Sequence, residues 1–101
     1  MITLLLALAS APVDPDSAPP KMANIYGIGS SSCAKAFDPA YRNEAFAWVM
    51  GYFSAHNEYS LRQVAGPDGE GIMGEIEIVC RARPSEKLVQ AAEQVFRKLR
   101  H

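Results

Sequence analysis

The sequence has little of the material from which catalytic and metal sites are built. It contains two histidines and two cysteines in 101 residues, and Cys33 and Cys80 lie far apart rather than in a Cys-x-x-Cys pair. Redox and zinc sites usually rely on closely spaced ligands of this kind. No Gly-x-Ser-x-Gly sequence surrounds a serine, which argues against a hydrolase nucleophile. We therefore predict no catalytic residue, no cofactor and no metal site.

The chain also lacks an excess of either charge and any long apolar run. Its formal net charge is −1, and no block of like charges occurs. This balance argues against nucleic acid or an anionic membrane as a partner. The N-terminal apolar run, residues 1–9, is far shorter than the roughly 20 residues that a membrane-spanning helix needs. We expect no stable membrane insertion.

The N-terminal quarter of the chain is different in composition from the rest. Residues 1–9 are almost entirely apolar and end in Ala7-Leu8-Ala9, the small-x-small pattern of a signal-peptidase site. Residues 10–25 contain four prolines and read as a disordered linker. We predict a signal peptide at 1–9, the linker at 10–25, a folded domain at 26–101, and export to the periplasm.

The two cysteines are best explained as a structural disulfide of an exported protein. The predicted domain has about 75 residues, a size at which one hydrophobic core gives marginal stability. A bond between Cys33 and Cys80 closes a loop of about 47 residues, for which the chain-entropy estimate is roughly 4 kcal/mol. Such a contribution is comparable with the whole stability expected of a small domain.

Helical patterns fill most of the domain. We predict a short helix carrying Cys33 and capped by the serines at 30–32, a central helix over 39–58 that starts at Asp38-Pro39, and a last helix over 85–100 capped by Ser85 or Arg83. The segment 72–80 fits either a helix or a strand, and a helix is favoured because no strand partner is evident. The predicted fold is a compact all-α bundle of three to four short helices held by one disulfide.

The central helix carries most of the aromatic residues. Trp48, Tyr52 and Phe53 are predicted to lie in the core, and one of them is a candidate anchor for a protein partner. Gly51 inside this helix weakens it by about 1 kcal/mol relative to alanine. We expect the compensation to be the close approach of another backbone.

The polar residues of the domain have simple interpretations. His56 could pair with Glu58 as an acid and a base, but a helix end with ordinary polar residues explains both, and a buried His56 could sense pH. The charged side of the last helix, including the i, i+4 pair Glu93 and Arg97, is expected to be a solvated surface.

At the level of motifs the domain resembles two groups of small secreted bacterial proteins. The pattern comprises Ser32-Cys33-x-x-x-Phe37, Trp48-Val-Met-Gly51-Tyr52-Phe-Ser54, Ile76-x-x-x-Cys80-x-x-x-Pro84 and Leu88-x-x-Ala91-Ala92-x-x-Val95. It is similar to the periplasmic acid-stress chaperones of the HdeA/HdeB type and to the Rap/Tai immunity proteins. The cysteine separation and Phe37 suit the chaperones, whereas the Trp48 segment leans toward the immunity proteins.

The resemblance implies a non-enzymatic protein-binding function. The first hypothesis is an HdeA-like stress chaperone that binds client proteins. The alternative is an immunity protein that neutralises a secreted cell-wall-degrading effector. Both imply a protein partner, and the sequence leaves a homodimer open.

Overall fold

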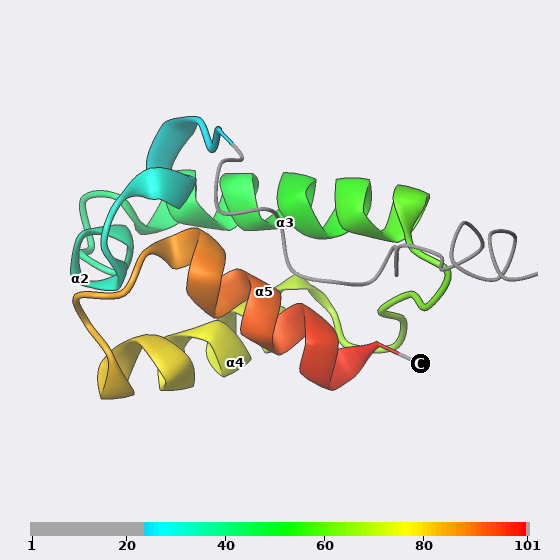
Figure 1. Ribbon diagram of the computed structural model, residues 1–101. Helices are drawn as coiled ribbons and strands as arrows, with labels where there is room; N and C mark the ends of the chain where they lie inside the picture. Colours follow the sequence, from blue (N-terminus) through cyan, green and yellow to red (C-terminus); the bar gives the residue numbers. More distant parts are fainter. Residues whose placement is uncertain (1–23, 101) are drawn as a thin grey trace, which may run out of the picture.

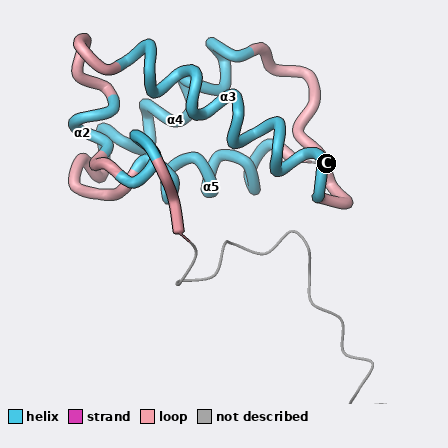
Figure 2. Tube along the Cα trace, turned by 90° about the horizontal axis from the view of Figure 1, so that it is seen from above, coloured by secondary structure: helices cyan, strands magenta, loops and turns pink. Residues whose placement is uncertain are grey.

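The computed structural model describes residues 24–100, so the predicted signal peptide and residues 10–23 of the predicted linker lie outside the described residues. The elements are the 3₁₀ helix η1 (Gly27–Ser30) and the α-helices α2 (Cys33–Ala36), α3 (Arg42–Tyr59), α4 (Gly69–Ala82) and α5 (Leu88–Leu99). Within the described range, extended pairing is limited to two isolated bridges, 32 with 87 and 64 with 100. The predicted all-α class is confirmed (Figure 2).

The three long helices enclose one core. Helices α3 and α5 run along the length of the molecule, with α2 at one end and the C-terminus at the other, and α4 packs against α5 (Figure 1). Each long helix has an apolar stripe at helical spacing, and these stripes face one another. The largest fully buried side chains are Val49, Met73, Ile76, Leu88, Val95 and Phe96.

The central helix begins later than its sequence predicts. Asp38 does not cap α3, because its carboxylate accepts a hydrogen bond from the Ala40 amide at 2.8 Å and its carbonyl accepts one from Tyr41 at 2.9 Å. These bonds form a separate turn, and α3 starts only at Arg42. The Asp-Pro pair is therefore a turn signal here, since an aspartate can bond to the backbone two residues ahead.

The other helix boundaries are partly as predicted. The ambiguous segment is helical and starts earlier than expected, because Asp68 caps α4 by accepting the Gly71 amide at 2.8 Å. Ser32 caps α2 as predicted. The predicted caps of the last helix are wrong: Lys87 is the N-cap residue, and the Gln90 side chain accepts its amide hydrogen at 2.9 Å.

The disulfide between Cys33 and Cys80 is present and joins α2 to α4. The two Cα atoms lie 5.2 Å apart, both residues are buried, and 47 positions separate them in the sequence. The Cys33 amide also donates to the carbonyl of Glu86 at 2.7 Å, which ties α2 to the start of the last helix. A buried disulfide of this kind is typical of proteins from oxidising, extracytoplasmic compartments.

The prediction that a second backbone approaches Gly51 closely is wrong. It lies on the exposed side of α3, and a Cβ built there meets nothing within 4 Å. Its flexibility is thus uncompensated. We expect Gly51→Ala to raise the free energy of unfolding by about 1 kcal/mol, the difference in helix propensity between the two residues.

Urea denaturation followed by circular dichroism measures this change. Gly74→Ala is a second test of the same principle, since Gly74 also lies inside a helix with open space around it. A loss of stability in the Gly51 variant would show that this position has a packing role that the structure does not reveal.

Within residues 24–100, no helix combines the length and apolar character required to cross a membrane.

Candidate functional site

A row of three rings runs along the side of α3 that faces α5. Trp48, Tyr52 and His56 are spaced four residues apart, so a helix places them on one face. The indole stacks on Tyr52 with ring centroids 5.1 Å apart, and His56 meets Tyr52 edge to face at 5.7 Å. The imidazole also stacks on Phe96 of α5, with centroids 3.7 Å apart. We call these three residues of α3 the aromatic ladder.

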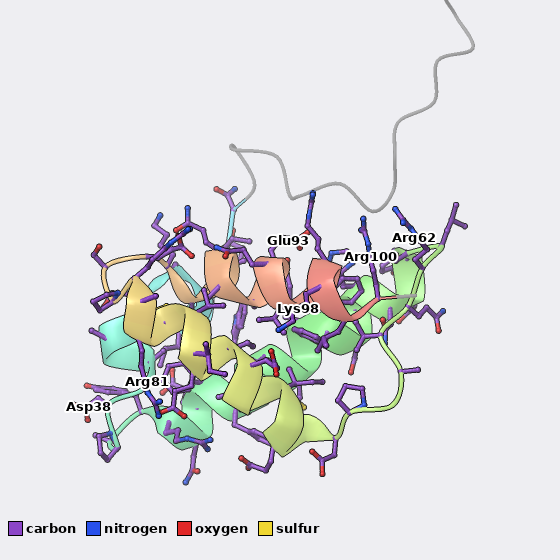
Figure 3. The ribbon with its side chains drawn as sticks, turned by 90° about the horizontal axis from the view of Figure 1, so that it is seen from below. Asp38, Arg62, Arg81, Glu93, Lys98 and Arg100 are labelled. Atoms are coloured by element: carbon purple, nitrogen blue, oxygen red, sulfur yellow. A yellow bond between two sulfur atoms is a disulfide. The ribbon has the colours of Figure 1, made fainter. Side chains whose placement is uncertain are left out.

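Two rings of the ladder, those of Tyr52 and His56, contact the buried carboxylate of Glu93. Glu93 is only 6% exposed, and Figure 3 shows where it lies on α5. Its Oε1 accepts a hydrogen bond from the Tyr52 hydroxyl at 2.5 Å and lies 3.0 Å from His56 Nε2. Its Oε2 accepts from Arg97 Nε at 2.9 Å. One acidic group therefore links two side chains of α3 to one of α5.

This acidic cluster, defined as Tyr52, His56, Glu93 and Arg97, corrects two sequence expectations. The ion pair between Glu93 and Arg97 is present as predicted, but Glu93 is buried rather than solvated. The acidic partner of His56 is Glu93, from another helix, rather than Glu58, which is exposed. A buried charge is costly unless it is paired and hydrogen-bonded, and this carboxylate has three polar partners.

A signal for the cluster does exist in the sequence. Glu93 falls inside the apolar stripe of α5, four residues after Val89 and three before Phe96, both of which are buried. A glutamate at such a position needs a partner on the facing helix. His56 and Tyr52 lie on the facing side of α3, but only the packing of the two helices shows that they meet Glu93.

The cluster perturbs the Tyr52 hydroxyl. Burial, together with the hydrogen bond to Glu93 and the negative charge of that residue, holds the pKa of Tyr52 well above its usual range. The neutral phenol is thus favoured in the folded state. Stability from this group is fully present below about pH 10, the ordinary pKa of tyrosine, and is lost as the pH rises further.

We expect the stability of the protein to fall with rising pH above about pH 10, with a contribution from Tyr52 of at most about 1.4 kcal/mol per pH unit. The value should be smaller in practice, because Tyr52 is only partly buried and solvent screens its interactions. Denaturant unfolding from pH 9 to 11 measures the slope. Tyr52→Phe should reduce it, whereas Tyr59→Phe, at a ring that is 78% exposed, should not. Equal slopes in the two variants would contradict this assignment.

The three predicted partner-binding residues differ in their exposure. Phe53 is buried in the core, where its ring meets Phe96 with centroids 5.3 Å apart. Trp48 and Tyr52 are half-buried. The Trp48 indole donates a hydrogen bond to the Tyr26 carbonyl at 2.9 Å, and η1 lies across it. In this conformation Phe53 is not accessible to a partner, and Trp48 is partly covered by the chain itself.

Two strongly exposed apolar side chains lie close together in the sequence where α3 ends. Tyr59 and Leu61 are 78% and 83% exposed. Tyr59 is the last residue of α3, and Leu61 lies in the loop that follows. Asn57 holds this loop, because its side chain both donates to the Val64 carbonyl at 3.0 Å and accepts from the Val64 amide at 2.9 Å. Arg62 and Arg100 lie at this end of the molecule, opposite to the end that carries Asp38 (Figure 3).

Other sites offer less chemistry. A shallow cavity of about 170 Å³ beside the disulfide is lined mainly by apolar groups, and His56 is not among its lining residues. Among residues 24–100, no group of three or more His, Cys, Asp or Glu side chains is placed to hold a metal ion. The serines at 30–32 act locally: Ser32 caps α2, and Ser30 donates to the Gly27 carbonyl at 3.0 Å.

Comparison of the chain with protein-family models, with curated proteins and with solved structures finds no match.

Proposed function

We propose that this protein is a small, non-enzymatic, protein-binding domain of the periplasm, of the HdeA-like acid-stress chaperone type. The observation that carries the proposal is the acidic cluster, which joins α3 to α5 through a carboxylate buried beside a histidine. The disulfide and the apolar N-terminal run support an exported protein. The partner class is an unfolded or partly unfolded client protein.

Acid changes the charge of the cluster in an unfavourable direction. The Glu93 carboxylate is paired with the Arg97 guanidinium, and the His56 imidazole stacks on Phe96. At about pH 3 carboxyl groups and imidazoles are protonated. The groups that face Glu93 are Tyr52, His56 and Arg97, so this carboxylate is the acid that lies between two basic side chains. Without its negative charge nothing in the cluster would offset them. Because buried like charges repel, the contact between α3 and α5 should weaken.

The net positive charge that the chain gains in acid adds to this repulsion, whereas the disulfide limits how far the domain can expand. Protonation of the eleven carboxylates and both histidines leaves the ten Lys and Arg and two His, a formal side-chain charge of about +12. Repulsion on this scale favours expansion. Cys33–Cys80 still holds α2 to α4, so separation of α3 from α5 bares the apolar faces that contain Phe53 and Phe96 without complete unfolding.

Light scattering by an aggregating client protein at about pH 2.5 tests the proposal. We expect the oxidised full chain to suppress aggregation at near-equimolar ratio and to have no effect at pH 7, where the core is closed. The reduced protein serves as the control for the disulfide. An aggregation curve at acid pH that is identical with and without the protein would refute the chaperone function.

A second function has a specific observation in its favour. Tyr59, at the end of α3, and Leu61, in the loop that Asn57 holds, are both exposed, and tyrosine is common among interface hot spots. This feature would suit an immunity protein of the Rap/Tai type, which neutralises a secreted cell-wall-degrading effector in its folded state. Capture of one such effector at pH 7 by the wild type, with Leu61→Asp as the matched control, would support it. Equal capture by both proteins would count against this surface.

A further inference from the structure

The segment that precedes α2 covers the exposed end of the aromatic ladder. Two glycines of η1 lie against the Trp48 indole: a Cβ on Gly29 would fall 2.0 Å from the ring, and one on Gly27 would fall 3.3 Å from it. Gly27 also has a φ of +74°, a conformation that favours glycine. Ile28 between them is buried. We call residues 24–30 the strap.

The strap is joined to the rest of the domain mainly by apolar packing: η1 lies against both α3 and α5, and Ile28 belongs to the hydrophobic core. Among the described residues, one hydrogen bond links the strap to another element: Trp48 Nε1 of α3 donates to the Tyr26 carbonyl. The bonds from Ser30 to Gly27 and from Ser31 to Ile28 stay within or next to the strap. Firm anchoring begins after it, where Leu88 donates to the Ser31 carbonyl at 2.9 Å. A segment held chiefly by apolar packing, with one hydrogen bond to the helices, can open while the helices keep their own backbone hydrogen bonds.

We propose that the strap is an internal stand-in for a client and that the Trp48 end of the aromatic ladder is a peptide-binding surface, uncovered when the strap leaves. This inference rests on the proposed function, because it names the client-binding part of the same protein. The strap already shows the contacts that a peptide would make. They are a carbonyl that accepts from the indole, a small residue against the ring, and an aliphatic side chain in the position of Ile28.

The preferred occupant is therefore an apolar segment of an unfolded polypeptide with a Gly-Ile-Gly-like pattern. Its backbone can approach the indole only where side chains are small, since a single Cβ at Gly29 would collide with Trp48. Folded proteins rarely present such segments, whereas unfolded chains do. The strap thus keeps the surface closed to folded and unfolded proteins alike until it opens.

Gly29→Ala should displace the strap from the indole and so open the site at neutral pH. The probe is a fluorescein-labelled peptide with the sequence of residues 24–32, titrated with the full chain at pH 7 and followed by anisotropy. We expect Gly29→Ala to bind it at least about tenfold more tightly than the wild type, in which only the open fraction is competent. Gly51→Ala, a glycine with open space around it, is the matched control and should bind like the wild type.

Two further changes test the contacts themselves. A peptide with Ile28→Asp should not bind, and adding Trp48→Phe to Gly29→Ala should weaken binding about fivefold, the effect of one lost hydrogen bond. Circular dichroism and an intact disulfide by mass spectrometry establish that each variant is folded. A folded Gly29→Ala protein that binds no better than the wild type, or that binds both peptides equally, would overturn the proposal.

Hydrogen exchange of the wild type keeps the proposal testable if Gly29→Ala does not fold. The Ser31 amide, which bonds to the Ile28 carbonyl, should exchange through openings that leave the Leu88 amide protected. Exchange of both amides only by global unfolding would show that the strap does not open. Peptide binding at pH 7 without client protection in acid would refute the chaperone function but not the surface. If the Trp48→Phe variant still protects clients in acid and hydrogen exchange shows no opening of the strap, the peptide-binding surface would be refuted but the chaperone function would not.

Discussion

Loss of the Cys33–Cys80 disulfide is expected to remove at least a third of the stability of the domain. The bond closes a 47-residue separation, and the chain-entropy estimate for a loop of this length is about 4 kcal/mol. A domain of this size has a total stability of about 4 to 12 kcal/mol. Because the bond also joins the short α2 to α4, its loss should free the N-terminal part of the fold first.

The double variant Cys33→Ala, Cys80→Ala measures this effect in urea denaturation beside the oxidised wild type. Alanine is chosen because both cysteines are buried and serine would bury two hydroxyl groups. Dithiothreitol treatment of the wild type should reproduce the result without mutation. A variant whose free energy of unfolding fell by less than about 1 kcal/mol would show that the helix packing suffices without the bond.

The second large effect is expected at Glu93. Glu93→Gln keeps the shape of the side chain but removes the charge that pairs with Arg97, and its amide cannot accept all three donors. We expect a loss of about 2 kcal/mol at pH 7, the usual range for a buried hydrogen bond to a charged group. Urea denaturation at pH 7, as for the cysteine variant, measures this loss.

Glu77→Gln is the matched control for this substitution. Glu77 pairs with Arg81 at 3.1 Å in the same i, i+4 arrangement within a helix, but on the surface. Exposed pairs contribute about 0 to 1 kcal/mol, so this variant should be almost as stable as the wild type at every pH. Similar losses in the two variants would mean that burial of Glu93 adds nothing, and the acidic cluster would then have no special role.

The architecture was largely predictable because it depends on local patterns. The apolar stripe of the last helix and the Ser32 cap each appear within a few residues of sequence, and both are confirmed. The disulfide was predictable for another reason: the chain has only two cysteines, so one pairing is possible within it. The start of α3 was not, because Asp38-Pro39 suits a turn as well as a helix cap. The choice depends on whether the Asp38 carboxylate bonds inside the turn.

The candidate site was less predictable because it is tertiary. Glu93 and His56 are 37 positions apart, and their contact depends on how α3 and α5 are packed. The sequence assigned His56 to a helix end and Glu93 to a solvated face, each plausible by itself. The cover over Trp48 was likewise not foreseen. Gly27 and Gly29 predict a turn from the sequence alone. Their close contact with the Trp48 indole can be known only once the position of α3 is known.

Acid should open the contact between α3 and α5 while the disulfide stays intact. An acid titration of the oxidised full chain from pH 7 to about pH 2, followed by near-UV circular dichroism and by binding of the dye ANS, measures this opening. We expect the aromatic signal to be lost and dye binding to appear below about pH 4, reversibly and with helical content largely kept. A near-UV spectrum at pH 2 that matches the one at pH 7, with no dye bound, would contradict it.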